Sequence, residues 1–269
     1  MRNFIDFRAF GSAILSSLLL VACGGGGNGG GTTTLATSAA PVASTPSVDG
    51  FYSGQTDKSE TVTGVILANN SYFMLYSKPN QPATLSGVVF GAGSASSGSF
   101  SSSASTDIRL NDTATPPAIT TPSVTLSASY EPKKTFNGTL SYPDNNVTAF
   151  TSSYNDAYAT APTLASLAGV YTGTIASAGL WESLTLTVAT DGTMSGPLLC
   201  DCNVSAIAQP LSAGNAYSIH IKFNGGNHLL SGLTLSGTAY LDTVNKRLVL
   251  FGNLEGATPQ PTIYFGTRP

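Results

Sequence analysis

The chain has 269 residues and a formal net charge of −3, and only 9% of its residues are charged, well below the roughly 25% typical of soluble domains. It has neither a basic stripe nor a polybasic patch, so the composition argues against nucleic acid as a partner. Serine, threonine, glycine and asparagine supply the polarity instead, a profile typical of β-sheet proteins outside the cytoplasm.

Residues 1–22 have the layout of a secretory signal peptide, with a basic start, a short apolar core and a small residue before the cleavage point. The apolar core is too short for a membrane-spanning helix, which needs about 20 residues. Its end, Leu20-Val21-Ala22-Cys23, resembles the lipobox of bacterial lipoproteins. The resemblance implies cleavage before Cys23 and attachment of lipid to Cys23. The alternative is an ordinary secreted protein that keeps Cys23 as a free thiol.

Residues 23–48 are predicted to be a flexible, disordered tether, because the glycine-rich run Gly24–Gly31 is followed by threonine, alanine, serine and proline. A cysteine followed by polyglycine resembles the anchors of surface lipoproteins such as transferrin-binding protein B and factor H-binding protein. In lipoproteins of Gram-negative bacteria, an aspartate after the cysteine often marks retention in the inner membrane. Gly24 stands there instead, so the resemblance implies the outer membrane, with membrane contact through the N-terminal lipid.

The remainder divides into two predicted β domains, residues 49–160 and 161–269. The motif Gly50-Phe51-Tyr52-Ser53-Gly54 recurs as Gly169-Val170-Tyr171-Thr172-Gly173. Each copy is followed by a loop, an alternating strand and a turn. This shared order predicts a tandem duplication.

Short alternating runs rich in β-branched and aromatic residues, bounded by turn residues, predict strands in both halves. In the first half these runs are Phe51–Gln55, Thr61–Leu67, Tyr72–Ser77, Thr84–Phe90, Gly98–Ser103, Asp107–Leu110, Ser123–Tyr130, Thr135–Tyr142 and Val147–Ser153. In the second half they are Gly169–Ile175, Glu182–Ala189, Gly192–Leu199, Val204–Gln209, Ala216–Phe223, Gly232–Leu241, Arg247–Leu254 and Thr262–Thr267.

Three segments of the sequence are irregular. The serine-rich run Ser94–Ser105 is predicted to be a long hairpin or a mobile loop, and the proline-rich segment from Pro116 to Pro122 a loop. A short helix is predicted over Thr163–Ala168, where Leu164 and Leu167 share one side of a turn.

The expected fold is all-β, with two tandem small antiparallel barrels of about eight strands each. These barrels would be lipocalin-like or transferrin-binding-protein-like, and two sandwiches are the alternative. Closure into barrels removes aggregation-prone edges. A transmembrane barrel is disfavoured, because its strands would need about 9–11 residues and an apolar outer band.

Two further cysteines, Cys200 and Cys202, are separated by one residue. A cysteine pair outside the cytoplasm suggests a disulfide, but two such residues in a strand lie about 6.5–7 Å apart, at the limit of disulfide geometry. A disulfide within a turn and a pair of thiols therefore both remain as interpretations. No metal site is predicted, because no further ligands stand nearby.

The sequence predicts no enzymatic activity and no cofactor. It has no nucleophile elbow, and the two histidines, His220 and His228, are expected on the solvated surface. A serine hydrolase would require one of them to lie near a serine and a carboxylate. Trp181 is expected to fill a core, and Tyr154 and Tyr158 are expected to pack between the halves.

The second copy of the repeated motif, together with the strand from Leu184 to Val188 and the turn Asp191-Gly192-Thr193, resembles lipoproteins of β- and γ-proteobacteria. In these, a small β domain follows a lipobox. The resemblance implies no activity. We therefore expect a lipid-anchored outer-membrane protein that acts as a binding, adhesion or envelope interaction module for a protein or glycan partner. The alternative is a lipocalin-like carrier of a small apolar ligand.

Overall fold

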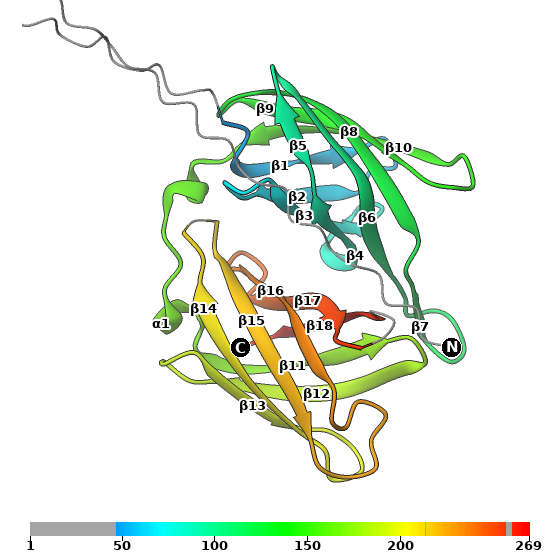
Figure 1. The fold of residues 1–269 in the computed structure, drawn as a ribbon, viewed down its shortest axis with the longest axis vertical. Coiled ribbons are helices and arrows are strands. Elements are labelled where there is room, and N and C mark those ends of the chain that lie inside the picture. The colour runs from blue at the N-terminus through cyan, green and yellow to red at the C-terminus, as the bar shows by residue number, and fades with distance from the viewer. Residues whose placement is uncertain (1–46, 213, 257–259) are drawn as a thin grey trace, which may run out of the picture. The chain divides into compact units, whose positions relative to one another are not determined.

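The computed structural model describes residues 47–212, 214–256 and 260–269, which form strands and two short helices (Figure 1). The predicted signal peptide, Cys23 and nearly all of the predicted tether lie outside these residues. Within the described part of the chain, neither helix combines the length and apolar character that a bilayer span requires.

Eight antiparallel strands of the first half close into a barrel (Figure 1). The ladder runs β4-β3-β2-β1-β10-β9-β8-β6, and pairing between β4 and β6 closes it. Two short strands, β5 and β7, also pair with β6. The bounds are β1 (Gly50–Thr56), β2 (Thr61–Ile66), β3 (Ser71–Lys78), β4 (Gln81–Ala92), β5 (Ser94–Ser96), β6 (Ser99–Asn111), β7 (Ala118–Thr120), β8 (Ser123–Glu131), β9 (Thr135–Ser141) and β10 (Val147–Tyr154).

The second half forms a closed barrel in which each strand pairs with its neighbours in the chain and β11 pairs with β18. Its bounds are β11 (Gly169–Ser177), β12 (Leu180–Val188), β13 (Thr193–Pro197), β14 (Asn203–Pro210), β15 (Ala216–Asn224), β16 (Thr234–Asp242), β17 (Arg247–Leu254) and β18 (Gln260–Thr267). The prediction of an all-β fold with two tandem antiparallel barrels is confirmed, and the sandwich alternative is wrong.

The first barrel departs from the prediction around β6. The two strands predicted over Gly98–Ser103 and Asp107–Leu110 are parts of this one strand, which has a register shift between Ser102 and Ser105. The serine-rich run forms the hairpin β5–β6, one of its two predicted alternatives. Strand β7 lies within the segment that the sequence predicts to be a loop.

Two short helices connect the barrels, η1 (Asp156–Ala159) and α1 (Leu164–Leu167). The second confirms the helix predicted there. The Thr163 side chain caps it by accepting a hydrogen bond from the backbone N–H of Ser166. Leu167 is fully buried in the interior core of the second barrel, so the helix packs onto that barrel.

The repeated motif occupies the same place in each barrel, on the first strand. The Tyr52 hydroxyl donates to the carbonyl of Val48 at 2.9 Å, and the Tyr171 hydroxyl donates to the carbonyl of Leu167 at 2.8 Å. In both cases the tyrosine ties its strand to the carbonyl four residues before it. The motif therefore serves the same local purpose twice, at the point where the chain enters each barrel.

The buried apolar side chains of the described residues form three clusters. One lies inside the first barrel and includes Tyr72 and Phe136. A larger one fills the interior of the second barrel and includes Tyr217 and Phe223. The third combines residues from both barrels, so the two outer walls share a core of their own.

Aromatic rings from the two barrels meet in this shared core. Phe73 of the first barrel lies with its ring centroid 5.5 Å from that of Tyr240 and 5.2 Å from that of Phe251, both in the second barrel. Tyr158 is buried in the same cluster. Tyr154 and Trp181 pack against the cluster and are partly buried. The packing predicted for the two tyrosines is therefore observed, and Trp181 contributes to a core as expected.

Replacing Phe73 with alanine should destabilise both barrels, because loss of a buried phenylalanine side chain costs about 3–5 kcal/mol. Trp181 is the single tryptophan, so its fluorescence reports on the second barrel, while far-ultraviolet circular dichroism reports on both. In denaturant, both signals should shift to one lower midpoint.

The matched control is Val244→Ala, since that side chain is 89% exposed, and its effect should stay within about 0.5 kcal/mol. If Phe73→Ala leaves the Trp181 transition at the wild-type position, the barrels unfold independently and the prediction is wrong.

Candidate functional site

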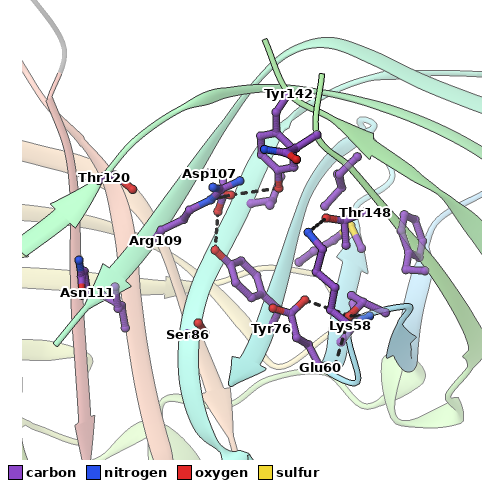
Figure 2. A pocket seen from close by; sticks show the side chains of 18 residues that line it. Lys58, Glu60, Tyr76, Ser86, Asp107, Arg109, Asn111, Thr120, Tyr142 and Thr148 are labelled. Carbon is purple, nitrogen blue, oxygen red and sulfur yellow. Dashed lines mark hydrogen bonds and ion pairs between the residues drawn. The ribbon is translucent and has the colours of Figure 1, made fainter. Parts of the chain in front are cut away.

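A cavity of about 440 Å³ lies inside one end of the first barrel (Figure 2). The turn β1–β2, the turn β9–β10 and the end of β6 all meet at this end. Five apolar side chains of the barrel interior form its floor, namely Val62, Met74, Val89, Leu140 and Phe150. Its wall and mouth are polar and carry four charged side chains, Lys58, Glu60, Asp107 and Arg109. An apolar floor below a charged mouth is suited to a molecule with one apolar and one polar end.

A buried carboxylate organises the wall of the cavity. Asp107 is fully buried, and three groups donate to it. The Tyr76 hydroxyl lies 2.8 Å from Oδ1, the Tyr142 hydroxyl lies 3.1 Å from Oδ2, and Arg109 Nε lies 2.6 Å from Oδ2. Because a buried charge is costly unless it is paired and hydrogen-bonded, these donors are what allow a carboxylate inside the barrel.

The alternation of β6 places this group. Asp107 and Arg109 are two residues apart and therefore project from the same face of the strand, into the cavity. Ile108 projects from the opposite face, into the core shared with the second barrel, and Leu110 belongs to the same core but also borders the cavity. The outer face of β6 is thus apolar, and its inner face is charged.

A glycine makes room for the tyrosine that reaches this carboxylate. At Gly87 on β4, a Cβ atom would lie 2.3 Å from the Tyr76 hydroxyl oxygen and 2.4 Å from the carbonyl oxygen of Ile108. Any larger residue would push the phenol away from Asp107.

Burial and the carboxylate keep both phenols neutral. Burial raises the pKa of Tyr76 well above its ordinary value, and the charge of Asp107 and its hydrogen bond raise it further. Burial likewise raises the pKa of Tyr142, followed by the charge of Asp107. For Arg109, burial lowers the pKa, but contacts with Asp107 and Tyr142 outweigh burial and raise it overall. Arg109 therefore stays charged, and its guanidinium lies 4.3 Å from the centroid of the Tyr142 ring.

The mouth holds a second cation and a second acid. Lys58, on the turn between β1 and β2, donates from Nζ to the Thr148 hydroxyl on β10 at 2.7 Å. Glu60 accepts from the Thr56 hydroxyl at 2.9 Å. Neither Lys58 nor Glu60 belongs to an ion pair among the described residues, and Figure 2 shows both side chains at the mouth.

The cysteine pair lies elsewhere, on the turn between β13 and β14. Cys200 is exposed, Cys202 is buried, and both are free thiols in this structure. Burial raises the pKa of the Cys202 thiol. Cys200 and Asp201 both have positive φ, 54° and 56°, and the N–H of Cys202 donates to the carbonyl of Leu199, which is the pattern of a tight hairpin turn. An oxidised form of this pair stays a prediction, as does lipid on Cys23.

His228 is not on the surface, so its predicted solvation is wrong. Its side chain is 5% exposed, and Nε2 lies 2.7 Å from an oxygen of Glu182. The N–H of Leu230 donates to Nδ1, so Nε2 carries the proton that Glu182 accepts. The other Glu182 oxygen accepts from the N–H of Leu199. The prediction fails because the loop between β15 and β16 folds inward and brings His228 to an acid from a different strand.

His220 is exposed, as predicted, and lies 3.2 Å from the Ser236 hydroxyl. This serine donates its proton to Glu255 at 2.6 Å, so His220 is not positioned as its base. The three residues therefore do not form the nucleophile–base–acid order that a hydrolase needs. In residues 47–212, 214–256 and 260–269, no three His, Cys, Asp or Glu side chains are grouped so as to hold a metal ion.

The residues that line the cavity are not among the predicted site residues, although one signal for them exists in the sequence. Asp107 and Arg109 alternate with Ile108 and Leu110, so a charged pair and an apolar pair lie on opposite faces. The usual interpretation places the charged face in solvent. That interpretation fails here because the second barrel covers the other face.

No protein-family model matches the chain, and no curated protein matches it. The crystal structure of a protein from Bacteroides fragilis NCTC 9343, provisionally described as an outer membrane protein, is similar at a TM-score of 0.26 and 12% identity, over 82% of this chain and 96% of that chain. A likeness of this degree supports no inference about function.

Replacing Asp107 with asparagine should lower the pKa of both Tyr76 and Tyr142, because the negative charge is among the causes that raise each one. NMR titration of chain labelled at tyrosine would measure both values. Asp112→Asn, which removes an exposed carboxylate paired with Lys78, is the control and should change neither. If Asp107→Asn leaves both pKa values in place, the carboxylate is not what holds these phenols neutral.

The raised pKa values of Tyr76 and Tyr142 also make the stability of the fold depend on pH in the alkaline range. A phenol whose pKa is raised in the folded chain contributes stability that is fully present below its unfolded value of about 10 and is lost as pH rises through the folded value. The wild-type free energy of unfolding should therefore decrease as pH rises above about 10. Asp107→Asn should lose less of it over the same range, as urea titrations at each pH can measure.

Proposed function

We propose that this chain is a lipid-anchored protein of the bacterial outer membrane whose first barrel binds a small amphipathic molecule. The observation that carries the binding part is the cavity in the open end of that barrel, with its apolar floor and charged mouth. Leu20-Val21-Ala22-Cys23 and the following glycine support the anchor and the membrane. Of the two roles expected from the sequence, the carrier fits this geometry best.

The size and lining of the cavity support a small ligand. Binding pockets for small molecules commonly measure about 300–1,000 Å³ and combine an apolar lining with a few polar groups that fix orientation, and 440 Å³ lies in this range. An eight-stranded barrel has an interior that either is filled by side chains or holds one small ligand. The second barrel is closer to the filled kind, because the apolar cluster in its interior is the larger of the two.

Contact with a protein or glycan partner is a second candidate, and one observation favours it. Leu199 is 66% exposed and Leu229 is 63% exposed. They belong to two loops that the Glu182–His228 pair joins. Two exposed leucines on loops held together in this way offer an apolar contact point at the end of the second barrel.

Ligand binding can be read from methionine methyl groups. The chain has three methionines, of which Met74 lines the cavity and Met194 lies in the filled interior of the second barrel. In full-length chain labelled at the methionine methyls and held in lipid nanodiscs, a bound amphipath should shift the Met74 signal and leave Met194 unchanged. Ser86→Trp, which places a ring at the cavity wall, should abolish the shift. Equal shifts at both methionines would indicate nonspecific interaction and count against the proposal.

The anchor is tested separately in cells. Cells grown with a clickable fatty acid should label the wild-type chain, and Cys23→Ser should abolish the label because it removes the acceptor thiol. Cys200→Ser is the matched control and should keep it. Label that survives Cys23→Ser would contradict lipid attachment at that residue.

A further inference from the structure

We propose that the ligand carries an anionic oxyacid head, such as a carboxylate, and that Lys58 is its ion partner. This inference rests on the proposed function of the cavity. It names the chemistry of the polar end of the ligand, which the volume and the apolar floor leave open.

The cations of the cavity have hydrogen-bond donors to spare. A lysine has three N–H groups and an arginine has five. Lys58 uses one of its groups on the Thr148 hydroxyl, and the hydrogen bond from Arg109 to Asp107 uses the one on Nε. The remaining N–H groups of both side chains can bind a ligand or solvent. Bonds from such charged donors to an anionic oxygen are the strong ones.

The two acidic side chains of the cavity, Asp107 and Glu60, differ in how many of their acceptor sites are already used. Asp107 already accepts from two phenols and from a guanidinium, and the guanidinium offsets its charge. Glu60 accepts from a single hydroxyl, that of Thr56. Among the four charged side chains, the two cations therefore keep about six unused N–H groups and the two acids keep about four unused acceptor sites. A ligand with several acceptor oxygens uses this surplus.

The position of Lys58 fits a head group above an apolar chain. Its backbone is on an exposed turn, and its ammonium reaches the hydroxyl of Thr148, which is 5% exposed. Phe150 lies two residues further along β10 and belongs to the floor. Residues two apart on a strand share a face. Strand β10 therefore places Thr148, where the head group of the ligand would lie, next to Phe150, where the apolar part of the ligand would lie.

Three probes that share one alkyl chain test the inference, namely decanoate, decanol and decyltrimethylammonium. The readout is the Met74 methyl shift in full-length chain in nanodiscs. Partition of a probe into the bilayer is the same for every variant, so the ratio of apparent affinities between variants reports on the protein alone. Lys58→Gln should weaken decanoate about tenfold and leave decanol nearly unchanged. Glu60→Gln should strengthen decanoate, because it removes a like charge from the mouth.

Lys78→Gln is the matched control, since Lys78 pairs with Asp112 and does not line the cavity. It should leave all three affinities unchanged. If Lys58→Gln weakens the binding of decanoate and decanol equally, the cavity binds amphipaths but Lys58 does not form an ion pair with the head group. In that case this inference fails while the proposed function stands. Tightest binding of decyltrimethylammonium, lost in Glu60→Gln, would overturn it in favour of a cationic head. If no probe shifts Met74, the proposed function fails, and this inference fails with it.

Discussion

A carboxylate buried inside a barrel is the constraint on which the first half of this structure depends. Three donors bond to Asp107 in the interior, and their side chains occupy space that apolar side chains would otherwise fill. The second barrel shows the alternative. Counted around the closed sheet from the first strand of each barrel, β15 is the fifth strand of the second barrel. Its side chains Tyr217, Ile219, Ile221 and Phe223 point into the interior core. Counted in the same way from β1, β6 is the fifth strand of the first barrel, and its buried positions include Ser102, Ser105 and Asp107 instead.

The packing of the two barrels explains why apolar side chains lie on the outside of the first one. In an isolated barrel, alternation sorts apolar residues inward and polar residues outward. Here the second barrel covers part of the outer wall, so Ile108 and Phe73 are buried on the outside of their strands. Strand β3 is accordingly apolar on both faces, with Tyr72 and Met74 in the interior core and Phe73 and Leu75 in the shared core. The inner face of β6 instead directs Asp107 and Arg109 into the cavity.

The sequence predicts the barrels well because strand alternation and turn residues are local signals. Every strand of the second barrel was located within two residues of its observed ends, and the fold class followed from the number of strands. The cavity could not be located in the same way, because the solvent side of a strand depends on a partner surface that no local pattern contains. His228 was misplaced for a related reason, since its burial depends on Glu182, far away in the chain. Local patterns thus predict elements, whereas contacts between distant segments decide which polar residues are enclosed.

The two barrels share a topology but differ at corresponding ends, and this difference bears on function. The cavity opens at the end formed by the turns β1–β2 and β9–β10. By strand order, the matching end of the second barrel holds the turn β13–β14 and the loop β15–β16, which the Glu182–His228 pair joins. Leu230 of that loop is 1% exposed and belongs to the interior core, so it acts as a plug. In the first barrel the matching connection carries β7, which pairs alongside Arg109 on β6 and places Thr120 on the cavity wall. A difference in one loop therefore separates a barrel whose end is plugged by Leu230 from a barrel with a cavity at the matching end.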